Sequence, residues 1–509
     1  MTDVSTVART TRPDAAALPG FPAHLVALVR EGGDDGAGGA AAAASELGSV
    51  PAFPVHDPAT GEVLALVADQ GPDDALCALD RAVAAADEWA ATPPRVRGET
   101  LRRAFDLLVE RRESFALLMS LEMGKPLAEA RGEVAYGGEF LRWFSEEAVR
   151  VQGRYGPVPE GTGTMIVTHR PVGPSYLVTP WNFPLAMATR KIAPALAAGC
   201  TVVVKPAELT PLTTIAFAEL LREAGVPDGV VTVLTTTDAA GVTGPLLADP
   251  RLRKLSFTGS TAVGRVLIAQ AAENVLRTSM ELGGNAPFVV MADADLDAAV
   301  DGAMLAKFRN GGQACTAANR LLVHERVADE FTRRLAERVE AMVVGPGTAD
   351  GTTLGPLIDD RAVATCERLV ADAVARGARV VTGGSAIDGP GSFFAPTVLA
   401  DVPRDADLMH QEIFGPVAAV TTFRDEDDAV RLANDTPYGL VAYLFTTDLA
   451  CGRRMLGRLR TGMLGVNTGL VSNAAAPFGG VGHSGLGREG GSEGIHEYLD
   501  TTYALQPDG

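Results

Sequence analysis

The 509-residue sequence contains few lysines, cysteines and aromatic residues, and these shortages exclude several kinds of function. Five lysines occur, so arginine supplies 39 of the 44 basic residues, which stand against 63 acidic ones. The formal net charge of −19 makes nucleic acid and anionic membrane surfaces poor partners. No run of about 18 uncharged apolar residues is present, and the N-terminal segment lacks the apolar centre of a signal peptide. We therefore expect a cytoplasmic protein with no membrane partner.

The five cysteines are an odd number and lie far apart in a long chain. This distribution argues against a disulfide framework and indicates a reducing compartment. Neither CxxC nor HExxH occurs, and no histidine stands at a metal-ligand spacing from another histidine or a cysteine. No metal site is predicted.

The composition, 47% hydrophobic and 21% charged, is that of a globular protein long enough for two or three domains. Residues 32–48 are rich in glycine and alanine and have no apolar period, which is typical of a flexible loop or linker. Residues 72–151 carry apolar side chains at intervals of three and four. That pattern predicts a series of amphipathic helices with solvated outer faces.

After position 171, short β-branched segments alternate with helical ones. This alternation predicts doubly wound parallel sheets, and the length favours two such α/β lobes. One helix is expected to start at Thr210 and Pro211, as N-cap and first-turn residue, and to end near Gly225. Strands are expected at residues 175–179, 201–205, 230–234 and 252–257 of the first lobe, and at 287–291, 321–323 and 379–381 of the second.

Two glycine-containing segments resemble phosphate-binding turns, and their sequence context separates them. GVGHSG at 480–485 fits the GxGxxG fingerprint, but no predicted strand precedes it, and we interpret it as a structural loop. FTGSTAVG at 257–264 follows a predicted strand and opens a predicted helix. Backbone N–H groups at such a helix start can face a pyrophosphate.

Three side chains are candidates for chemistry. Cys315 lies between glycines and a polar segment, whereas the other four cysteines lie in helical or apolar contexts typical of buried, inert thiols. A thiol with a pKa of about 8.5 needs only modest activation to act as a nucleophile. Glu281 precedes a flexible Leu-Gly-Gly turn, which fits either a catalytic carboxylate or a surface glutamate. Asn182, between two prolines at a predicted strand end, is suited to donate to an oxyanion.

Seven motifs occur in an order and spacing that resemble the aldehyde dehydrogenase superfamily, from about residue 51 to residue 503: PWNFP, KPAE, FTGS, ELGG, GQAC, EIFGP and PFGG. The segments TRK (189–191), KFRNGGQAC (307–315), ELGGNAPF and NTGLVSN are most similar to succinate-semialdehyde dehydrogenases. The resemblance implies an α/β fold of two doubly wound, Rossmann-like lobes with a small β oligomerisation arm. The implied parts are an N-terminal segment (1–50), a dinucleotide-binding domain (51–153 and 171–281), a catalytic domain (282–480), and an arm with the C-terminal tail (154–170 and 481–509).

The same resemblance implies a mechanism. Cys315 attacks the aldehyde carbon, and the oxyanion is held by Asn182 and the backbone N–H of Cys315. Loss of hydride to the nicotinamide ring leaves a thioester, and a water deprotonated by Glu281 hydrolyses it to the acid. The residues implied to bind the dinucleotide are Trp181, Lys205, Glu208, Gly259, Ser260, Glu412 and Phe414.

Lys205 and Glu208 carry the choice of cofactor. A carboxylate at position 208 accepts hydrogen bonds from both ribose hydroxyls and repels a 2′-phosphate, so we expect NAD to be preferred. NADP is the alternative, because Lys205 can meet a phosphate.

Substrate choice depends on Arg190, Arg309 and Ser472, which match the positions that hold the distal carboxylate in succinate-semialdehyde dehydrogenases. Arginine donates two parallel hydrogen bonds to a carboxylate, which favours an acid semialdehyde over a neutral aldehyde by a factor on the order of hundreds. The alternative is that Arg190 or Arg309 is an ordinary salt-bridge partner, since the chain contains 39 arginines.

The sequence thus predicts NAD(P)-dependent oxidation of succinate semialdehyde to succinate by a homodimer or homotetramer. A glutarate-semialdehyde or broad-specificity aldehyde dehydrogenase is the alternative within the class, because one methylene changes preference only about 10- to 200-fold. A catalytically silent binding protein on the same fold is the alternative from another class.

Overall fold

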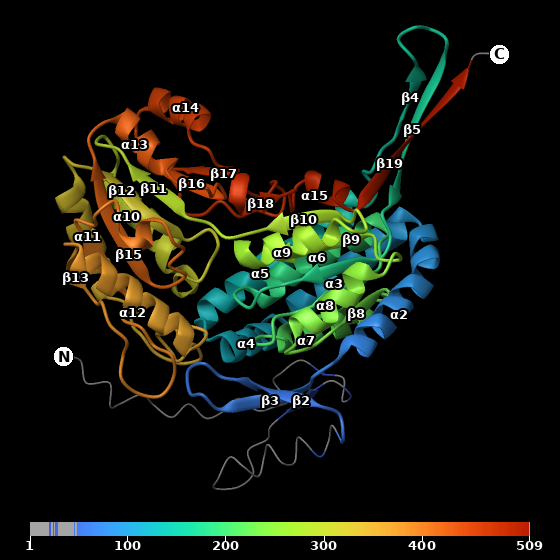
Figure 1. The fold of residues 1–509 in the computed structure, drawn as a ribbon, viewed down its shortest axis with the longest axis horizontal. Coiled ribbons are helices and arrows are strands. Elements are labelled where there is room, and N and C mark those ends of the chain that lie inside the picture. The colour runs from blue at the N-terminus through green and yellow to red at the C-terminus, as the bar shows by residue number, and fades with distance from the viewer. Residues whose placement is uncertain (1–19, 22–23, 25, 29–44, 46–47, 508–509) are drawn as a thin grey trace.

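The computed structural model describes residues 20–21, 24, 26–28, 45 and 48–507. The loop expected at 32–48 therefore lies outside the described residues, apart from positions 45 and 48. Figure 1 shows two α/β lobes side by side, a narrow β arm projecting from one of them, and a small sheet beneath. The prediction of a two-lobed α/β fold is confirmed.

The first lobe contains a six-stranded sheet in the order β18-β10-β9-β6-β7-β8. Five of its strands run parallel, and β18 pairs antiparallel with β10 at one edge. The predicted strands are present with ends shifted by at most two residues. The strands are β6 (Ser175–Val178), β7 (Val202–Lys205), β8 (Val231–Val233), β9 (Lys254–Thr258), β10 (Arg277–Glu281) and β18 (Gly485–Leu486).

Helices cover both faces of this sheet, each over its own apolar core. One face packs against the helices predicted between residues 72 and 151 and against the two that follow β6 and β7: α3 (Pro94–Glu110), α4 (Arg112–Met123), α5 (Leu127–Glu147), α6 (Pro184–Ala198) and α7 (Leu212–Glu223). The other face packs against α2 (Pro72–Ala91), α8 (Ala239–Ala248) and α9 (Thr261–Ala271).

The second lobe contains a seven-stranded sheet in the order β13-β14-β15-β12-β11-β16-β17, parallel except for β13. The strands are β11 (Ala286–Val290), β12 (Ala318–His324), β13 (Arg379–Thr382), β14 (Thr397–Ala400), β15 (Val417–Phe423), β16 (Val441–Phe445) and β17 (Met463–Val466). The covering helices are α10 (Leu296–Phe308) and α11 (Ala328–Glu340) on one face and α12 (Asp360–Ala375), α13 (Glu426–Ala433) and α14 (Leu449–Arg458) on the other.

The arm is a hairpin of β4 (Arg154–Pro157) and β5 (Gly163–Pro171), joined by the C-terminal strand β19 (Leu499–Pro507). β19 pairs antiparallel with β5 along its whole length. The arm extends away from the body of the protein (Figure 1). The small sheet beneath the lobes has the order β1-β3-β2, with β1 (Val26–Leu28), β2 (Ala52–His56) and β3 (Val63–Ala68).

The start of α7 differs from the prediction. Pro211 occupies the N-cap position without a side-chain cap, and the Thr210 hydroxyl donates instead to the Trp181 carbonyl (3.3 Å). The first N–H groups of the helix donate to the Glu122 carboxylate, from Leu212 at 2.9 Å and Thr213 at 3.0 Å. A distant carboxylate thus replaces the local cap that the sequence suggests.

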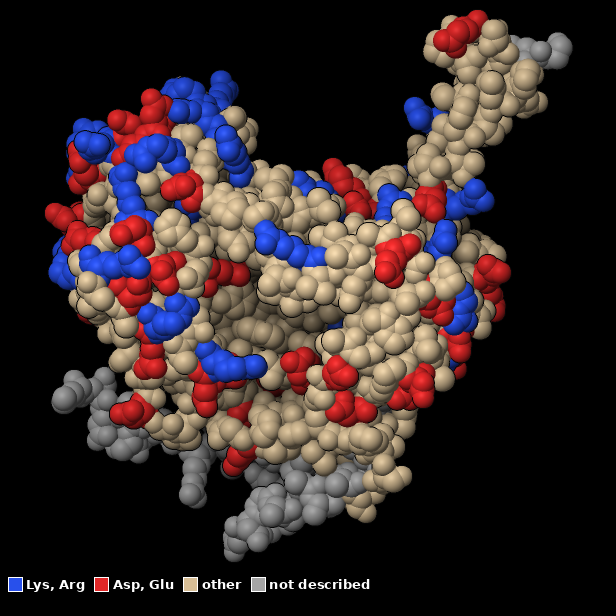
Figure 2. Space-filling model, in the orientation of Figure 1, with Lys and Arg blue, Asp and Glu red and all other residues tan. Residues whose placement is uncertain are grey.

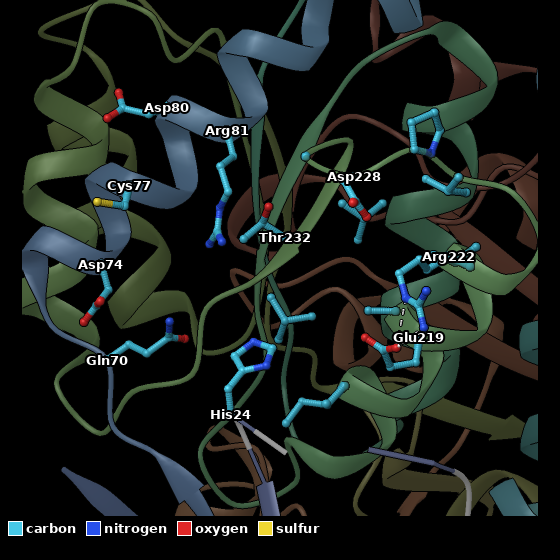
Figure 3. Close-up of a pocket in the computed structure, with 18 of the residues that line it drawn as sticks. His24, Gln70, Asp74, Cys77, Asp80, Arg81, Glu219, Arg222, Asp228 and Thr232 are labelled. Carbon is cyan, nitrogen blue, oxygen red and sulfur yellow. Dashed lines mark hydrogen bonds and ion pairs between the residues drawn. The ribbon is translucent and has the colours of Figure 1, made fainter. Parts of the chain in front are cut away.

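The interpretation of Cys77 as a buried thiol is wrong, because its side chain is exposed on α2. It lines a cavity of about 1100 Å³ at the β8 edge of the six-stranded sheet. Figure 3 shows Asp74, Cys77 and Asp80 on one side of this cavity and the Glu219–Arg222 ion pair on the other. None of the predicted site residues lines it. Among the described residues, no helix is both long and apolar enough to cross a lipid bilayer.

Candidate active site

The predicted catalytic residues lie where the two lobes meet. Glu281 is the last residue of β10, Asn182 lies in the loop after β6, and Cys315 lies between α10 and β12. The space-filling view shows a hollow between the lobes with charged side chains on its rim (Figure 2). Because the carboxyl ends of parallel strands form the ligand-binding edge of such sheets, the fold brings these side chains to a common cleft.

A tight turn before Cys315 depends on left-handed backbone conformations. Asn310, Gly311 and Gly312 have φ values of 57°, 63° and 72°. A Cβ at Gly312 would lie 2.2 Å from the carbonyl oxygen of Gly415, in the EIFGP motif. Glycine at position 312 therefore lets the segment that carries Cys315 pack against that motif.

The ELGG motif joins Glu281 to Cys315 in a similar way. A Cβ at Gly284 would lie 2.6 Å from the Cys315 carbonyl oxygen, so only glycine permits this approach. The Gly284 N–H donates to Glu412 at 3.2 Å. The motif thus places the end of β10, the cysteine turn and the EIFGP segment in contact.

Asn182 is fixed beside the cysteine turn. Its side-chain Nδ2 donates to the Gln313 carbonyl at 2.9 Å, and its own carbonyl accepts from Lys125 Nζ (2.9 Å) and Asn310 Nδ2 (3.0 Å). A primary amide has two N–H groups, so one remains for an oxyanion. Lys125 is itself buried in an ion pair with Glu133, which anchors the arrangement.

Burial raises the pKa of the half-buried Cys315 thiol to about 12. Arg190 and Arg309 lower this pKa, and Glu412 and Glu281 raise it further. Formation of the thiolate requires a base close to the sulfur.

Glu281 has the properties of that base. Its side chain is 3% exposed, and its Oε2 has no hydrogen-bond partner among the described residues. Burial, and then the negative charge of Glu489, raise its pKa well above the ordinary value, whereas Arg190 and Lys191 lower it. The alternative of a surface glutamate is wrong.

Glu489 is a site residue that the sequence did not indicate. Burial alone would raise its pKa, but Lys191 (Nζ to Oε1, 2.5 Å) and Arg190 hold it below the usual range. It stays ionised close to Glu281, and this charge makes Glu281 the stronger proton acceptor. Glu489 and Lys191 are 298 residues apart in the chain, so no local pattern could have paired them.

The three predicted substrate residues surround the side chain of Tyr136 in α5. Arg190 and Ser472 lie beside its hydroxyl, and Arg309 is close enough to lower its pKa. The Arg190 side chain is 1% exposed and paired with Glu489, as the salt-bridge alternative anticipates. Arg309 contacts the Phe183 ring (5.2 Å to its centroid) but forms no ion pair with any residue that the structure describes.

The predicted pyrophosphate turn joins β9 to α9. Ser260 is the N-cap of α9, where its Oγ accepts from Val263 N at 3.3 Å, and Gly259 N donates to the Glu281 carbonyl at 3.1 Å. A Cβ at Gly259 would lie 2.5 Å from the Phe257 ring. A strand end, a tight turn and a free helix N-terminus are the features that hold phosphate groups. The GVGHSG segment forms a short 3-10 turn and the edge strand β18 instead.

Lys205 is the last residue of β7, and Glu208 lies in the loop that follows that strand. Lys205 Nζ donates to the Pro206 carbonyl (3.1 Å) and lies 3.8 Å from Glu208, whose side chain is 45% exposed. Burial lowers the pKa of Lys205, and the Glu208 charge raises it. The exposed carboxylate is available to sugar hydroxyls.

Trp181, Glu412 and Phe414 are the remaining residues predicted to bind the dinucleotide. The Trp181 and Phe414 rings meet edge to face with centroids 5.4 Å apart, and Phe414 has a left-handed φ of 52°. Burial raises the pKa of Glu412 to about 7, and its bond from Gly284 N lowers it. A strand-end turn at a helix N-terminus, together with an exposed carboxylate beside Lys205, fits a dinucleotide.

Comparison with known proteins agrees with this geometry. Residues 46–504 match the family model described as the aldehyde dehydrogenase family. The chain is 62% identical to succinate-semialdehyde dehydrogenase of Paenarthrobacter nicotinovorans, covering 87% of this chain and 98% of that protein. It is 49% identical to a glutarate-semialdehyde dehydrogenase of Pseudomonas aeruginosa (88% and 93%) and 48% identical to a succinate-semialdehyde dehydrogenase [NADP(+)] of Escherichia coli (89% and 94%). The crystal structure of succinate-semialdehyde dehydrogenase from Burkholderia pseudomallei superposes with a TM-score of 0.90 at 46% identity, covering 97% of this chain and 99% of that one.

Proposed function

The chain belongs to the aldehyde dehydrogenase family, and on that premise we propose that it oxidises succinate semialdehyde to succinate, with NAD as the preferred cofactor. The similarity to the Paenarthrobacter enzyme supports the substrate, and the positions of the site residues support the mechanism.

Cys315 is the nucleophile, and Glu281 takes its proton. The aldehyde oxygen becomes an oxyanion between the free N–H of Asn182 and the backbone N–H of Cys315, and each such donor contributes on the order of a hundredfold to a thousandfold in rate. A bound nicotinamide dinucleotide supplies the acceptor for the hydride that leaves the substrate carbon. Glu281 first releases the cysteine proton to solvent and then deprotonates a water, which attacks the Cys315 thioester; the acid leaves, and the departing Cys315 thiolate takes a proton back from Glu281.

The choice of NAD follows from Glu208. Its exposed carboxylate, 3.8 Å from Lys205, suits two ribose hydroxyls, whereas a 2′-phosphate would meet its negative charge. The Gly259–Ser260 turn binds the pyrophosphate, and Trp181, Glu412 and Phe414 contact the nicotinamide riboside. NADP is the second cofactor to test, because the Escherichia coli relative is named as an NADP(+) enzyme.

One observation carries the choice of an acid substrate: the Arg309 guanidinium lies in the cleft without an ion pair among the described residues. A positive charge kept partly buried and unpaired is costly unless a ligand carboxylate completes it. Arg190 and Ser472 stand beside the same position and complete the carboxylate site.

The experiment is a comparison of kcat/KM for succinate semialdehyde, glutarate semialdehyde and butanal, with NAD and with NADP. We expect the C4 acid with NAD to be used best, and Arg309→Met to lose about a hundredfold on both acids while butanal is unaffected. Arg102→Met, which breaks an exposed pair with Asp106, is the matched control and should change nothing. A wild-type enzyme that oxidises butanal as well as the acids would contradict the proposal.

Glutarate semialdehyde is the second candidate substrate, supported by the Pseudomonas aeruginosa relative and by the small effect of one methylene. The same panel ranks the two acids. The alternative of a catalytically silent binding protein is tested by activity itself: wild type must oxidise the semialdehyde, and Cys315→Ala must abolish that activity if the mechanism holds.

We also propose a cytoplasmic homodimer or homotetramer, assembled through the arm at 154–170 and the C-terminal tail. We assign residues 51–153 and 171–281 to the dinucleotide-binding domain and residues 282–480 to the catalytic domain. Strand β18 lies in the tail range but pairs with β10, so the tail also closes the sheet that carries Glu281.

A further inference from the structure

Tyr136 has a buried hydroxyl without a hydrogen-bond partner. The atom is shielded from solvent, and no described residue completes a hydrogen bond of good geometry with it, although Arg190 and Ser472 both approach. Two other buried tyrosines are satisfied, Tyr176 by Thr243 (3.0 Å) and Tyr443 by the Thr316 carbonyl (2.8 Å). A buried hydroxyl is normally paired, so an unpaired one in a cleft indicates a ligand group.

The Tyr136 ring lies in a small apolar cluster next to the nucleophile. Two members flank Cys315 in the chain, and the others come from the start of α6: Phe183, Ala186, Met187, Ala314 and Ala317. The other edge of the Tyr136 ring packs against the core of the first lobe, where it meets the Phe140 ring edge to face with centroids 5.0 Å apart. The cluster provides an apolar surface of the kind that a short methylene chain contacts beside a reacting carbonyl.

The hydroxyl end of Tyr136 meets the positive part of the site. Arg190 and Arg309 both lower its pKa, and burial raises it, so the hydroxyl stays protonated at neutral pH. A protonated phenol is a hydrogen-bond donor. Arg190 already shares its charge with Glu489, whereas Arg309, Ser472 and the phenol have no committed partner among the described residues and can donate to an anion.

We propose that Tyr136 is a specificity-determining residue, whose ring covers the methylene groups of the substrate and whose hydroxyl donates to its distal carboxylate. This inference rests on the proposed oxidation of an acid semialdehyde. One rigid side chain then recognises both the apolar and the anionic part of the substrate. A neutral aldehyde gains the apolar contact but leaves the hydroxyl unpaired, and that difference selects against it.

The test is Tyr136→Phe, which removes the hydroxyl and keeps the ring. We expect kcat/KM for succinate semialdehyde to fall about tenfold or more, chiefly through KM, with butanal oxidation within about twofold of wild type. The inhibition constant of succinate against butanal oxidation should rise by a similar factor. Tyr176→Phe, which removes a buried hydroxyl that bonds to Thr243 in the core of the first lobe, is the matched control and should change neither the preference for the acid over butanal nor the inhibition by succinate.

The possible results separate the inference from the function on which it rests. If wild type does not prefer the acid to butanal, the proposed function fails. If wild type shows the preference and Tyr136→Phe keeps it, or loses both substrates in proportion, the role of Tyr136 is overturned. If Tyr136→Phe does not fold, Tyr136→Met retains the apolar contact and is judged by the same ratio.

Discussion

At the scale of single residues, the scarcity of lysine has a structural counterpart. All five lysines are buried, with exposed fractions of 3% or less: Lys125, Lys191, Lys205, Lys254 and Lys307. Arginine instead makes almost all the surface ion pairs. A buried ammonium must be paired or shift its pKa, and Lys191 shows the first outcome by holding Glu489 ionised next to Glu281. In this chain the lysines therefore supply buried positive charges, whereas the arginines form the surface ion pairs.

The pH dependence of the reaction follows from Glu281. Its pKa is raised well above the ordinary value, and a general base must be ionised, so kcat/KM should fall as pH drops through that raised pKa. The optimum should lie on the alkaline side of neutrality. Glu281→Gln should lose about a hundredfold to ten-thousandfold in rate together with the acidic limb of the profile. A Gln variant that keeps the wild-type limb would assign the titration to another group.

Sequence motifs indicated Cys315, Asn182 and Glu281 as candidate catalytic residues, because each lies in a local pattern that the backbone requires. Gly284 and Gly312, for example, permit close approaches to backbone carbonyls that any side chain would block. Glu489 and Tyr136 were missed for the opposite reason. Their roles come from contacts with residues distant in the chain, and a single buried Glu or Tyr leaves no pattern in its own neighbourhood.

At the scale of elements, glutamates from α4 and α5 cap other helices. Glu122 accepts from the first N–H groups of α7, and Glu133 accepts from Leu185 N (3.0 Å) and Ala186 N (3.1 Å) at the start of α6. Glu129 accepts from Asn310 N (2.7 Å) in the turn before Cys315. These carboxylates tie the helical layer to the strand ends that carry the site.

Glu122→Ala should destabilise the first lobe by about 2 to 4 kcal/mol, because it leaves two buried N–H groups unpaired. Burial raises the pKa of Glu122 to about 7, above its unfolded value, so the folded state binds the proton more tightly. The stabilisation that comes from this tighter proton binding is complete below the pKa that Glu122 has in the unfolded chain. It is lost as the pH rises through the folded-state pKa of about 7. The cost of the substitution, measured by urea unfolding, should therefore be smaller at pH 8 than at pH 5.

The control for that measurement is Glu223→Ala, at the other end of α7. Glu223 pairs with Arg111 on the exposed surface, where such pairs contribute little. Equal losses for the two variants at every pH would contradict the capping role of Glu122.

Strands were easier to predict than helix starts, because a strand depends on its own sequence whereas a helix cap can come from a distant residue. A buried parallel strand needs a run of apolar, β-branched side chains in its own sequence, as in Val202–Lys205. The cap of α7 comes instead from Glu122, 90 residues away, so the local Thr-Pro signal was misleading. The position of β18 beside β10 likewise depends on a contact between segments that are far apart.

At the scale of the whole molecule, the arm presents apolar side chains to solvent. Tyr155, Tyr503 and Leu505 are 79%, 56% and 50% exposed on β4 and β19. A long strand pair with free edges and exposed apolar groups favours association. Tyr503→Asp combined with Leu505→Asp should convert the proposed oligomer to a smaller species in analytical ultracentrifugation. An unchanged sedimentation coefficient would show that the arm does not hold the subunits together.

The net charge of −19 has its own consequence for an anionic substrate. The overall field repels the acid semialdehyde, and at an ionic strength of 0.01 M the screening length of about 30 Å lets this repulsion reach the mouth of the cleft. At 0.15 M the length falls to about 8 Å, whereas the attraction of Arg309 acts within contact distance and is screened much less. We therefore expect kcat/KM for succinate semialdehyde to rise about two- to threefold over this range, with butanal unchanged as the neutral control. A fall with salt for the acid alone would mean that the local positive site, and not the acidic surface, governs the approach of the substrate.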